Sequence, residues 1–166
     1  MEEIKLLPED IINEIAAGEV IEKPSAVVKE LIENSIDAQA TNINVHIELG
    51  GIKKIIVTDN GIGIDKEYIF KAIQRHATSK MNNKTLENII TLGFRGEALS
   101  SISNASELEI ISKNKNMKEA WQINVAYGQI LSNKPSKGTD GTKVIVKNLF
   151  ENLPVRKKFL NSSRSE

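Results

Sequence analysis

Three polar residues of the segment 25–38 are spaced so that they could act on one ligand. At 100° per residue, Glu30, Asn34 and Asp37 fall on one narrow stripe of a helix. A carboxylate and a carboxamide one turn apart can activate a water molecule and together hold a hard cation. The opposite side carries the residues that can pack on a sheet, namely Val28, Leu31, Ile32 and Ser35. The stripe therefore predicts a polar site on an amphipathic helix.

A second candidate group follows about twenty residues later, in the segment Asp59-Asn60-Gly61-Ile62-Gly63. Asp59 offers a hydrogen-bond acceptor, and the two glycines allow ligand atoms to approach the backbone closely. Taken alone, an aspartate before Asn-Gly is typical of a turn, and both glycines fit that interpretation equally well. Together with the helix stripe, however, the segment predicts a nucleotide site.

Local signals predict the elements that position these groups. Pro24 opens the helix, with Ser25 as its cap. Residues 42–49 alternate strictly, as in a half-buried strand, and Gly50-Gly51 turns the chain into a second strand, Lys53 to Thr58. This second strand ends next to Asp59, so we expect Asp59 to lie at the carboxyl end of a strand.

The remaining elements follow the same signals. Asp65 caps a further helix, and another helix begins near Glu97. The other expected segments are a helix from Pro8 to Ala17, strands at 108–112, 121–125 and 143–147, a shorter strand at 129–131, a loop at 134–141 and a mobile lid at 81–92. Helices grouped around consecutive strands predict one domain over residues 1–166, an α+β two-layer sandwich with helices on a mixed, mostly antiparallel sheet.

Composition restricts the class of protein. The chain has 166 residues, of which 40% are hydrophobic and 27% charged, as in an ordinary globular domain. No apolar run approaches the roughly 20 residues of a membrane span, and the acidic start lacks the apolar core of a secretory signal. The sequence contains no cysteine, which excludes disulfides and thiolate metal sites and fits a cytoplasmic location.

The charge balance also bears on nucleic-acid binding. Lys and Arg number 22, and Asp and Glu number 22, so the formal net charge is zero. A dedicated DNA-binding domain is usually basic, so we expect DNA to be bound only weakly and non-specifically. The basic cluster Arg156, Lys157, Lys158 and Arg164 is interpreted as a solvated helix face.

Five segments between Ile15 and Leu160 resemble the GHKL ATPase superfamily and, within it, the MutL family of DNA mismatch-repair proteins. They read IAAGEVIEKPSAVVKELIENSIDA, DNGIGI, RHATSK, LGFRGEALSSIS and FENLPVRKKFL. The ENSIDA or DNGIG segment alone indicates only the superfamily, whereas the helix segment, HATSK and GFRGEAL together indicate the MutL type. The resemblance implies the Bergerat fold and Mg²⁺-dependent ATP hydrolysis.

The resemblance also assigns roles to the residues. It makes Glu30 the general base, Asn34 the ligand of Mg²⁺ and the triphosphate, and Asp59 the acceptor for the exocyclic amine of adenine. Asp37 either contacts the ligand or shapes the site through the backbone. The other ATP-binding residues that it implies are Ala38, Gly61, Gly63, Thr78, Ser79, Lys80, Gly93, Phe94, Arg95, Gly96, Ala98, Leu99 and Thr142. Arg95 either contacts phosphate or locks the lid.

The partners that the resemblance implies are a mismatch-recognition protein of the MutS type, a downstream nuclease or helicase, and a second copy of the chain when ATP is bound. Members of the family continue into a transducer domain, whose lysine reaches the γ-phosphate, and into a C-terminal dimerisation domain. The sequence ends at Glu166, so we expect a fragment with weak turnover. Two alternatives stay open: a nucleotide-gated interaction module without significant turnover, and another GHKL ATPase of the gyrase type.

Overall fold

The computed structural model of the protein describes residues 5–9, 11, 12, 15, 21–74, 97–158 and 160. The predicted helix at 8–17 falls partly outside these ranges, and the predicted lid at 81–92 falls wholly outside them. No helix in the described ranges is long and apolar enough to cross a membrane.

Six described strands form one sheet, in the order β1-β2-β6-β3-β4-β5. Their bounds are β1 Ile43–Glu48, β2 Lys54–Asp59, β3 Glu107–Lys113, β4 Ala120–Ala126, β5 Gln129–Ser136 and β6 Gly141–Lys147. Each neighbouring pair is antiparallel. The predicted α+β two-layer fold is thus confirmed, with antiparallel pairs alone among the described strands.

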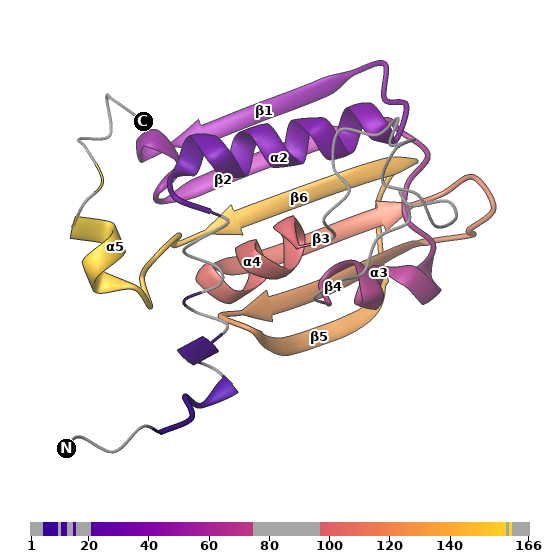
Figure 1. Cartoon of the computed structure of the whole chain (residues 1–166). Helices are drawn as coiled ribbons and strands as arrows, with labels where there is room; N and C mark the ends of the chain where they lie inside the picture. The colour runs from indigo at the N-terminus through magenta and orange to yellow at the C-terminus, as the bar shows by residue number, and fades with distance from the viewer. Residues whose placement is uncertain are drawn as a thin grey trace, which may run out of the picture.

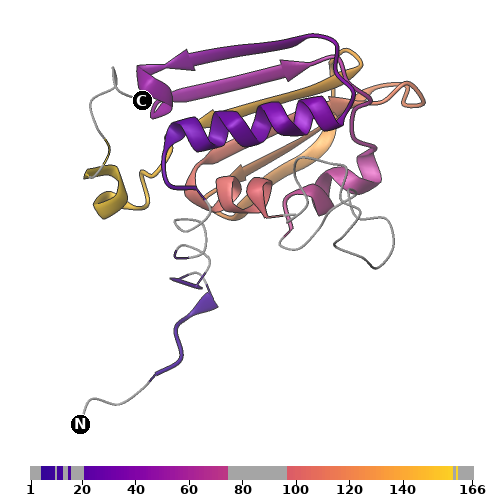
Figure 2. The same ribbon diagram turned by 45° about the horizontal axis from the view of Figure 1, so that its top comes forward.

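The described helices are α2 Pro24–Asp37, α3 Lys66–Ala72, α4 Ala98–Ala105 and α5 Pro154–Lys158, with a 3₁₀ turn, η1, at Leu49–Gly51. Figures 1 and 2 show α2, α3 and α4 in one layer on the same face of the sheet. Helix α2 contacts β2, whereas α3 and α4 contact β3 and β4. Asp65 caps α3 as predicted, because its carboxylate accepts a hydrogen bond of 3.1 Å from the backbone N–H of Glu67.

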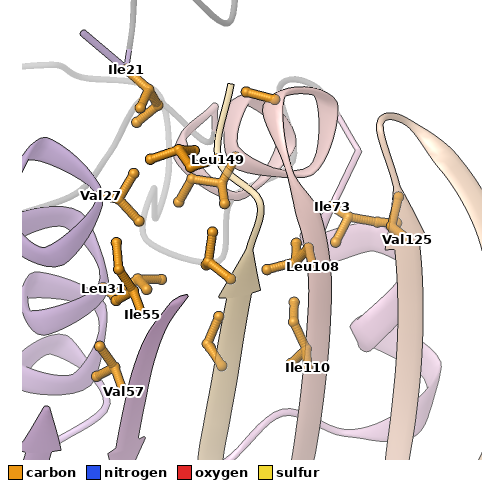
Figure 3. Packing of buried hydrophobic residues seen from close by; sticks show 14 of the residues in the cluster. Ile21, Val27, Leu31, Ile55, Val57, Ile73, Leu108, Ile110, Val125 and Leu149 are labelled. Carbon is orange, nitrogen blue, oxygen red and sulfur yellow. The ribbon is translucent and has the colours of Figure 1, made fainter. Parts of the chain in front are cut away.

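The core lies between this helix layer and the sheet (Figure 3). Alternate residues of the central strands are buried there, as the period of two requires. Figure 3 labels Val27 and Leu31 of α2 facing Ile55 and Val57 of β2. The helix that carries the predicted polar stripe is therefore held on the sheet by apolar packing along its length.

Helix α2 differs from the prediction at its start and in its buried face. It begins at Pro24 with Lys23 as N-cap, so the assignment of Ser25 as cap was wrong. Proline fits the first turn because it needs no backbone N–H partner there. The buried residues are Pro24, Val27, Leu31 and Ser35, whereas Ile36 is 50% exposed. Glu30 and Asn34 therefore flank the buried stripe.

The two edge strands also depart from the prediction. On β1, Val45 and Ile47 are 40% and 47% exposed, so this strand is less buried than its alternation predicts. Strand β5 runs to Ser136, so the assignment of Lys134–Ser136 to a loop was wrong. Pro135 is compatible with a strand here, because an edge strand has backbone N–H groups that need no ladder partner.

Glu48 at the end of β1 gathers three cationic groups, and this predicts a measurable pH dependence. Its carboxylate lies 2.9 Å from Lys54 Nζ, 3.1 Å from Lys53 Nζ and 3.4 Å from His46 Nε2. Hydrogen bonds from Lys54 first, and then from Lys53 and His46, lower the pKa of Glu48 to about 2. The ion pairs thus stabilise the fold above the ordinary carboxyl pKa, and this contribution is lost as pH falls toward 2.

We expect Lys54→Met to raise the Glu48 titration midpoint toward the ordinary carboxyl value, because the largest cause of the shift is removed. Carboxyl ¹³C chemical shifts followed over pH would measure both midpoints. Lys118→Met, far along the sequence and exposed, is the matched control and should leave the midpoint unchanged. An equal midpoint in wild type and Lys54→Met would contradict this account of Glu48.

Candidate functional site

A row of cross-strand partners at one end of the sheet is polar, although the rest of this face is apolar. Asp59 of β2 pairs with Thr142 of β6, and Thr142 pairs with Ser112 of β3. All three follow the alternation of the buried residues in their strands, so they face the helix layer. The sheet thus places three polar side chains in one line under the helices.

Hydrogen bonds from three donors fix the Asp59 carboxylate. Its Oδ1 accepts from the backbone N–H of Gly61 at 2.9 Å and of Thr142 at 3.2 Å. Its Oδ2 accepts from the Ser35 hydroxyl of α2 at 2.8 Å. Each carboxylate oxygen has two lone pairs. Counting donors in the described residues, Oδ1 is satisfied and Oδ2 keeps one position for a ligand.

The loop after Asp59 packs against the end of α2. The backbone N–H of Ile62 donates to the carbonyl of Ala38 at 2.9 Å. A Cβ added at Gly61 would lie 2.6 Å from that carbonyl oxygen, and one added at Gly63 would lie 2.2 Å from the oxygen of Lys113. Gly63 also has φ +72°, which favours glycine. Protein packing therefore requires both glycines, and their predicted contact with ligand stays a prediction.

Glu30 and Asn34 lie on α2 beside this cluster. Both are half-buried, and they are one helical turn apart, about 40° around the axis. The bond from Ser35, the next residue after Asn34, ties this part of α2 to Asp59. The structure thus brings Ser35, Ala38 and Gly61 to the Asp59–Thr142 pair. Asn34 precedes Ser35 on the helix, and Glu30 lies one turn closer to the start of the helix.

The oxygen donors of this cluster fit a magnesium ion that takes most of its ligands from water and from phosphate oxygens. Magnesium keeps several waters, takes phosphate oxygens and needs only one or two protein oxygens. Asn34 can supply such an oxygen. Within the described ranges, no three His, Cys, Asp or Glu side chains are grouped to hold a metal. A metal centre built wholly from such side chains is therefore not what the described residues form.

Helix α4 brings two more of the predicted residues to the helix layer. Ala98 is its first residue, after the N-cap Glu97, and Leu99 packs against the core. Helix α4 also contacts α2, so its N-terminal backbone N–H groups belong to the layer that carries Glu30. The other predicted positions lie outside the described residues: Thr78, Ser79, Lys80, Gly93, Phe94, Arg95 and Gly96.

Sequence reasoning missed two serines of this site. Ser35 was interpreted only as a residue that packs on the sheet, and Ser112 only as the end of a strand. Both are buried, with 3% and 1% of their surface exposed. The available signal was a hydroxyl in a position that periodicity assigns to the core, since a buried polar group needs partners. Asp59, two residues after Val57 in the same strand, is such a partner for Ser35.

Comparison with known proteins agrees with this geometry. The family model described as histidine kinase-, DNA gyrase B-, and HSP90-like ATPase matches residues 22–149. The DNA mismatch repair protein MutL of Herminiimonas arsenicoxydans is 51% identical over 98% of this chain and 27% of its own length. MutL of Thermodesulfovibrio yellowstonii is also 51% identical, over 100% of this chain and 30% of its own length. The chain thus spans less than a third of these relatives.

A solved structure extends the comparison to three dimensions. The Aquifex aeolicus MutL ATPase domain complexed with ADP has a TM-score of 0.71 and 38% identity, and the match covers 88% of this chain and 50% of that one. These similarities confirm the resemblance that the sequence motifs predicted. The chain therefore belongs to the histidine kinase-, DNA gyrase B- and HSP90-like ATPase family, in which it is similar to the MutL ATPase domains.

Proposed function

We propose that the site at Asp59 binds the adenine of ATP and that Glu30 promotes hydrolysis of the γ-phosphate. The observation that carries this proposal is the fixed Asp59 carboxylate, with one acceptor position left on Oδ2 among the described donors. An acceptor held in this way matches the exocyclic amine of adenine, whereas guanine presents a carbonyl at the same edge. The similarity to a MutL domain complexed with ADP supports the same ligand class.

Each residue then has a defined task. Glu30 orients a water molecule and takes its proton as the oxygen attacks phosphorus. Asn34 would hold Mg²⁺, which when bound supplies positive charge next to the phosphate oxygens. The backbone N–H groups at the start of α4, from Ala98, would bind phosphate oxygens, as at other helix N-termini. Asp59 and Thr142 hold the base at the opposite end of the nucleotide.

Titration calorimetry with ATP and GTP in the presence of Mg²⁺ tests the proposal. We expect ATP to bind at least about tenfold more tightly, because the guanine carbonyl would face the Asp59 oxygen and leave a polar edge mispaired. The same titrations without Mg²⁺ serve as the control for Asn34. We expect ATP to bind more weakly when Mg²⁺ is absent. Equal affinity for ATP and GTP would refute the assignment of Asp59 to the base.

We further propose that the activity belongs to a MutL-type mismatch-repair protein of the cytoplasm, associated with the nucleoid during repair. ATP binding would order the lid and favour a dimer of two copies, which would signal from a mismatch-recognition protein to a nuclease or helicase. The similarity to full-length MutL relatives supports this role. Because the net charge is zero, the protein would bind DNA weakly, and rising salt would abolish this binding. Residues 1–166 would form the nucleotide-binding part of that longer protein.

A further inference from the structure

Ser112 on β3 makes more polar contacts than its place in a strand core requires. Its Oγ lies 2.7 Å from the backbone nitrogen of Ile64, 3.1 Å from the carbonyl oxygen of Gly141 and 2.8 Å from Thr142 Oγ1. The side chain is 1% exposed, so water contributes little to these bonds. Ser112 therefore links the loop after Gly63 to the start of β6 through hydrogen bonds, and it lies next to Thr142 on the neighbouring strand.

The number of protons in this cluster decides the direction of each bond. A serine hydroxyl has one proton to donate and two lone pairs to accept. The Ile64 N–H can only donate, and the Gly141 carbonyl can only accept. If Ser112 donates to Gly141 and accepts from Ile64, its second lone pair accepts from Thr142. All three contacts are then hydrogen bonds.

The reverse arrangement is unfavourable. If Ser112 donated to Thr142, one of its lone pairs would face the Gly141 carbonyl at 3.1 Å. Two acceptors would then be in contact in a buried place, without the bond that compensates for their lost hydration. The geometry thus assigns the Thr142 proton to Ser112.

This assignment fixes what Thr142 presents to a ligand. Its proton is used by Ser112, and its backbone N–H is used by Asp59. Thr142 is half-buried, unlike Ser112, so its remaining lone pairs are the part that a ligand or a bridging water can reach. Asp59 and Thr142 then offer acceptors side by side, so a base whose position 6 carries a donor is preferred over one whose position 6 carries a carbonyl.

We propose that Ser112 is a positioning residue that sets base selectivity by fixing the direction of the Thr142 hydroxyl. Ser112 acts through Thr142 and does not touch the nucleotide. Without it, the Thr142 hydroxyl can rotate and donate to a carbonyl, so a base with a 6-oxo group is tolerated. The proposal rests on the proposed function, because it requires a nucleotide base at Asp59.

Calorimetric titration of the protein with ATP and inosine triphosphate, at constant Mg²⁺, tests this role. The two nucleotides differ along one edge of the base: adenine has a 6-amine donor beside an N1 acceptor, whereas hypoxanthine has a 6-carbonyl acceptor beside an N1–H donor. We expect Ser112→Ala to lower the ATP-to-ITP affinity ratio about fivefold, the effect of one hydrogen bond. Ser112→Thr retains the hydroxyl and should restore the ratio. A general loss of structure would weaken the binding of both nucleotides and would leave the ratio of their affinities unchanged.

Further variants sharpen the result. Ser106→Ala removes an equally buried serine hydroxyl, which donates only to Ile102 O within the described structure, and it should leave the ratio unchanged. On a Thr142→Val background, Ser112→Ala should produce no further change, because Ser112 acts through that hydroxyl. If Ser112→Ala does not fold, Ser112→Cys carries the test, since a thiol accepts hydrogen bonds only weakly.

The outcomes separate this inference from the proposed function. An unchanged ratio in a folded Ser112 variant, with ATP still preferred by wild type, would overturn the inference and leave the function intact. An equal fall in Ser106→Ala would also overturn it. Absence of ATP binding by wild type would overturn the proposed function, and the inference with it.

Discussion

Glu30→Ala is expected to lower ATP turnover by a hundredfold or more while ATP binding stays close to that of wild type. A general base acts on the attacking water in the transition state and contributes little to ground-state binding. The part of the site proposed to bind adenine does not depend on Glu30, because Asp59 is held by Ser35, Gly61 and Thr142. The loss should therefore appear in kcat and not in the dissociation constant.

Steady-state phosphate release and equilibrium ATP binding, measured on the same preparation of the full-length protein, would separate the two quantities. Glu33→Ala is the matched control, because Glu33 lies on the same helix and pairs with Lys29 at 2.9 Å. Removing that surface pair should change stability only slightly and leave kcat within about twofold of wild type. Wild-type turnover in Glu30→Ala would show that another group activates the water.

The contrast between Glu30 and Ser112 shows what could be predicted from the sequence. Glu30, Asn34 and Asp59 are marked by local patterns, a helical stripe and a strand that ends at a turn, so their elements were found correctly. The row Asp59–Thr142–Ser112 depends on β6 lying between β2 and β3. That neighbour relation joins residues that are distant in the sequence, and no local periodicity encodes it.

Two predictions from the sequence were wrong, namely the cap of α2 and the loop at 134–136. The cap of α2 was placed at Ser25 from residue preference, but the helix begins one residue earlier, at Pro24, which suits the first turn and is buried with Val27 and Leu31. Residues 134–136, which are polar and contain a proline, were assigned to a loop. Their place at the edge of the sheet makes both features acceptable, and pairing with β4 extends the strand. For the strand, tertiary context overrode local preference.

The second large effect is expected at Asp59, where Asp59→Asn should reverse the preference for the base. The direction of the new amide is set by the protein. The backbone N–H groups of Gly61 and Thr142 both point at Oδ1, so the asparagine oxygen must occupy that position. Its NH₂ group then replaces Oδ2, facing Ser35 and the ligand. Ser35 can accept from it by donating instead to the Leu31 carbonyl at 3.1 Å.

The internal hydrogen bonds are therefore retained in Asp59→Asn, whereas a donor now faces the amine of adenine. We expect ATP affinity to fall at least about tenfold, because burying two donors against each other costs about 1–3 kcal/mol. ITP, with a carbonyl at the same position, should lose far less or bind more tightly than to wild type. Asp140→Asn is the control, since Asp140 pairs with Lys113 at the surface at 2.6 Å, and its affinities should match wild type. If calorimetry found the same ATP-to-ITP ratio in wild type and Asp59→Asn, with the variant folded by circular dichroism, the Oδ2 position would not contact the base, because the amide reverses the polarity of that position alone.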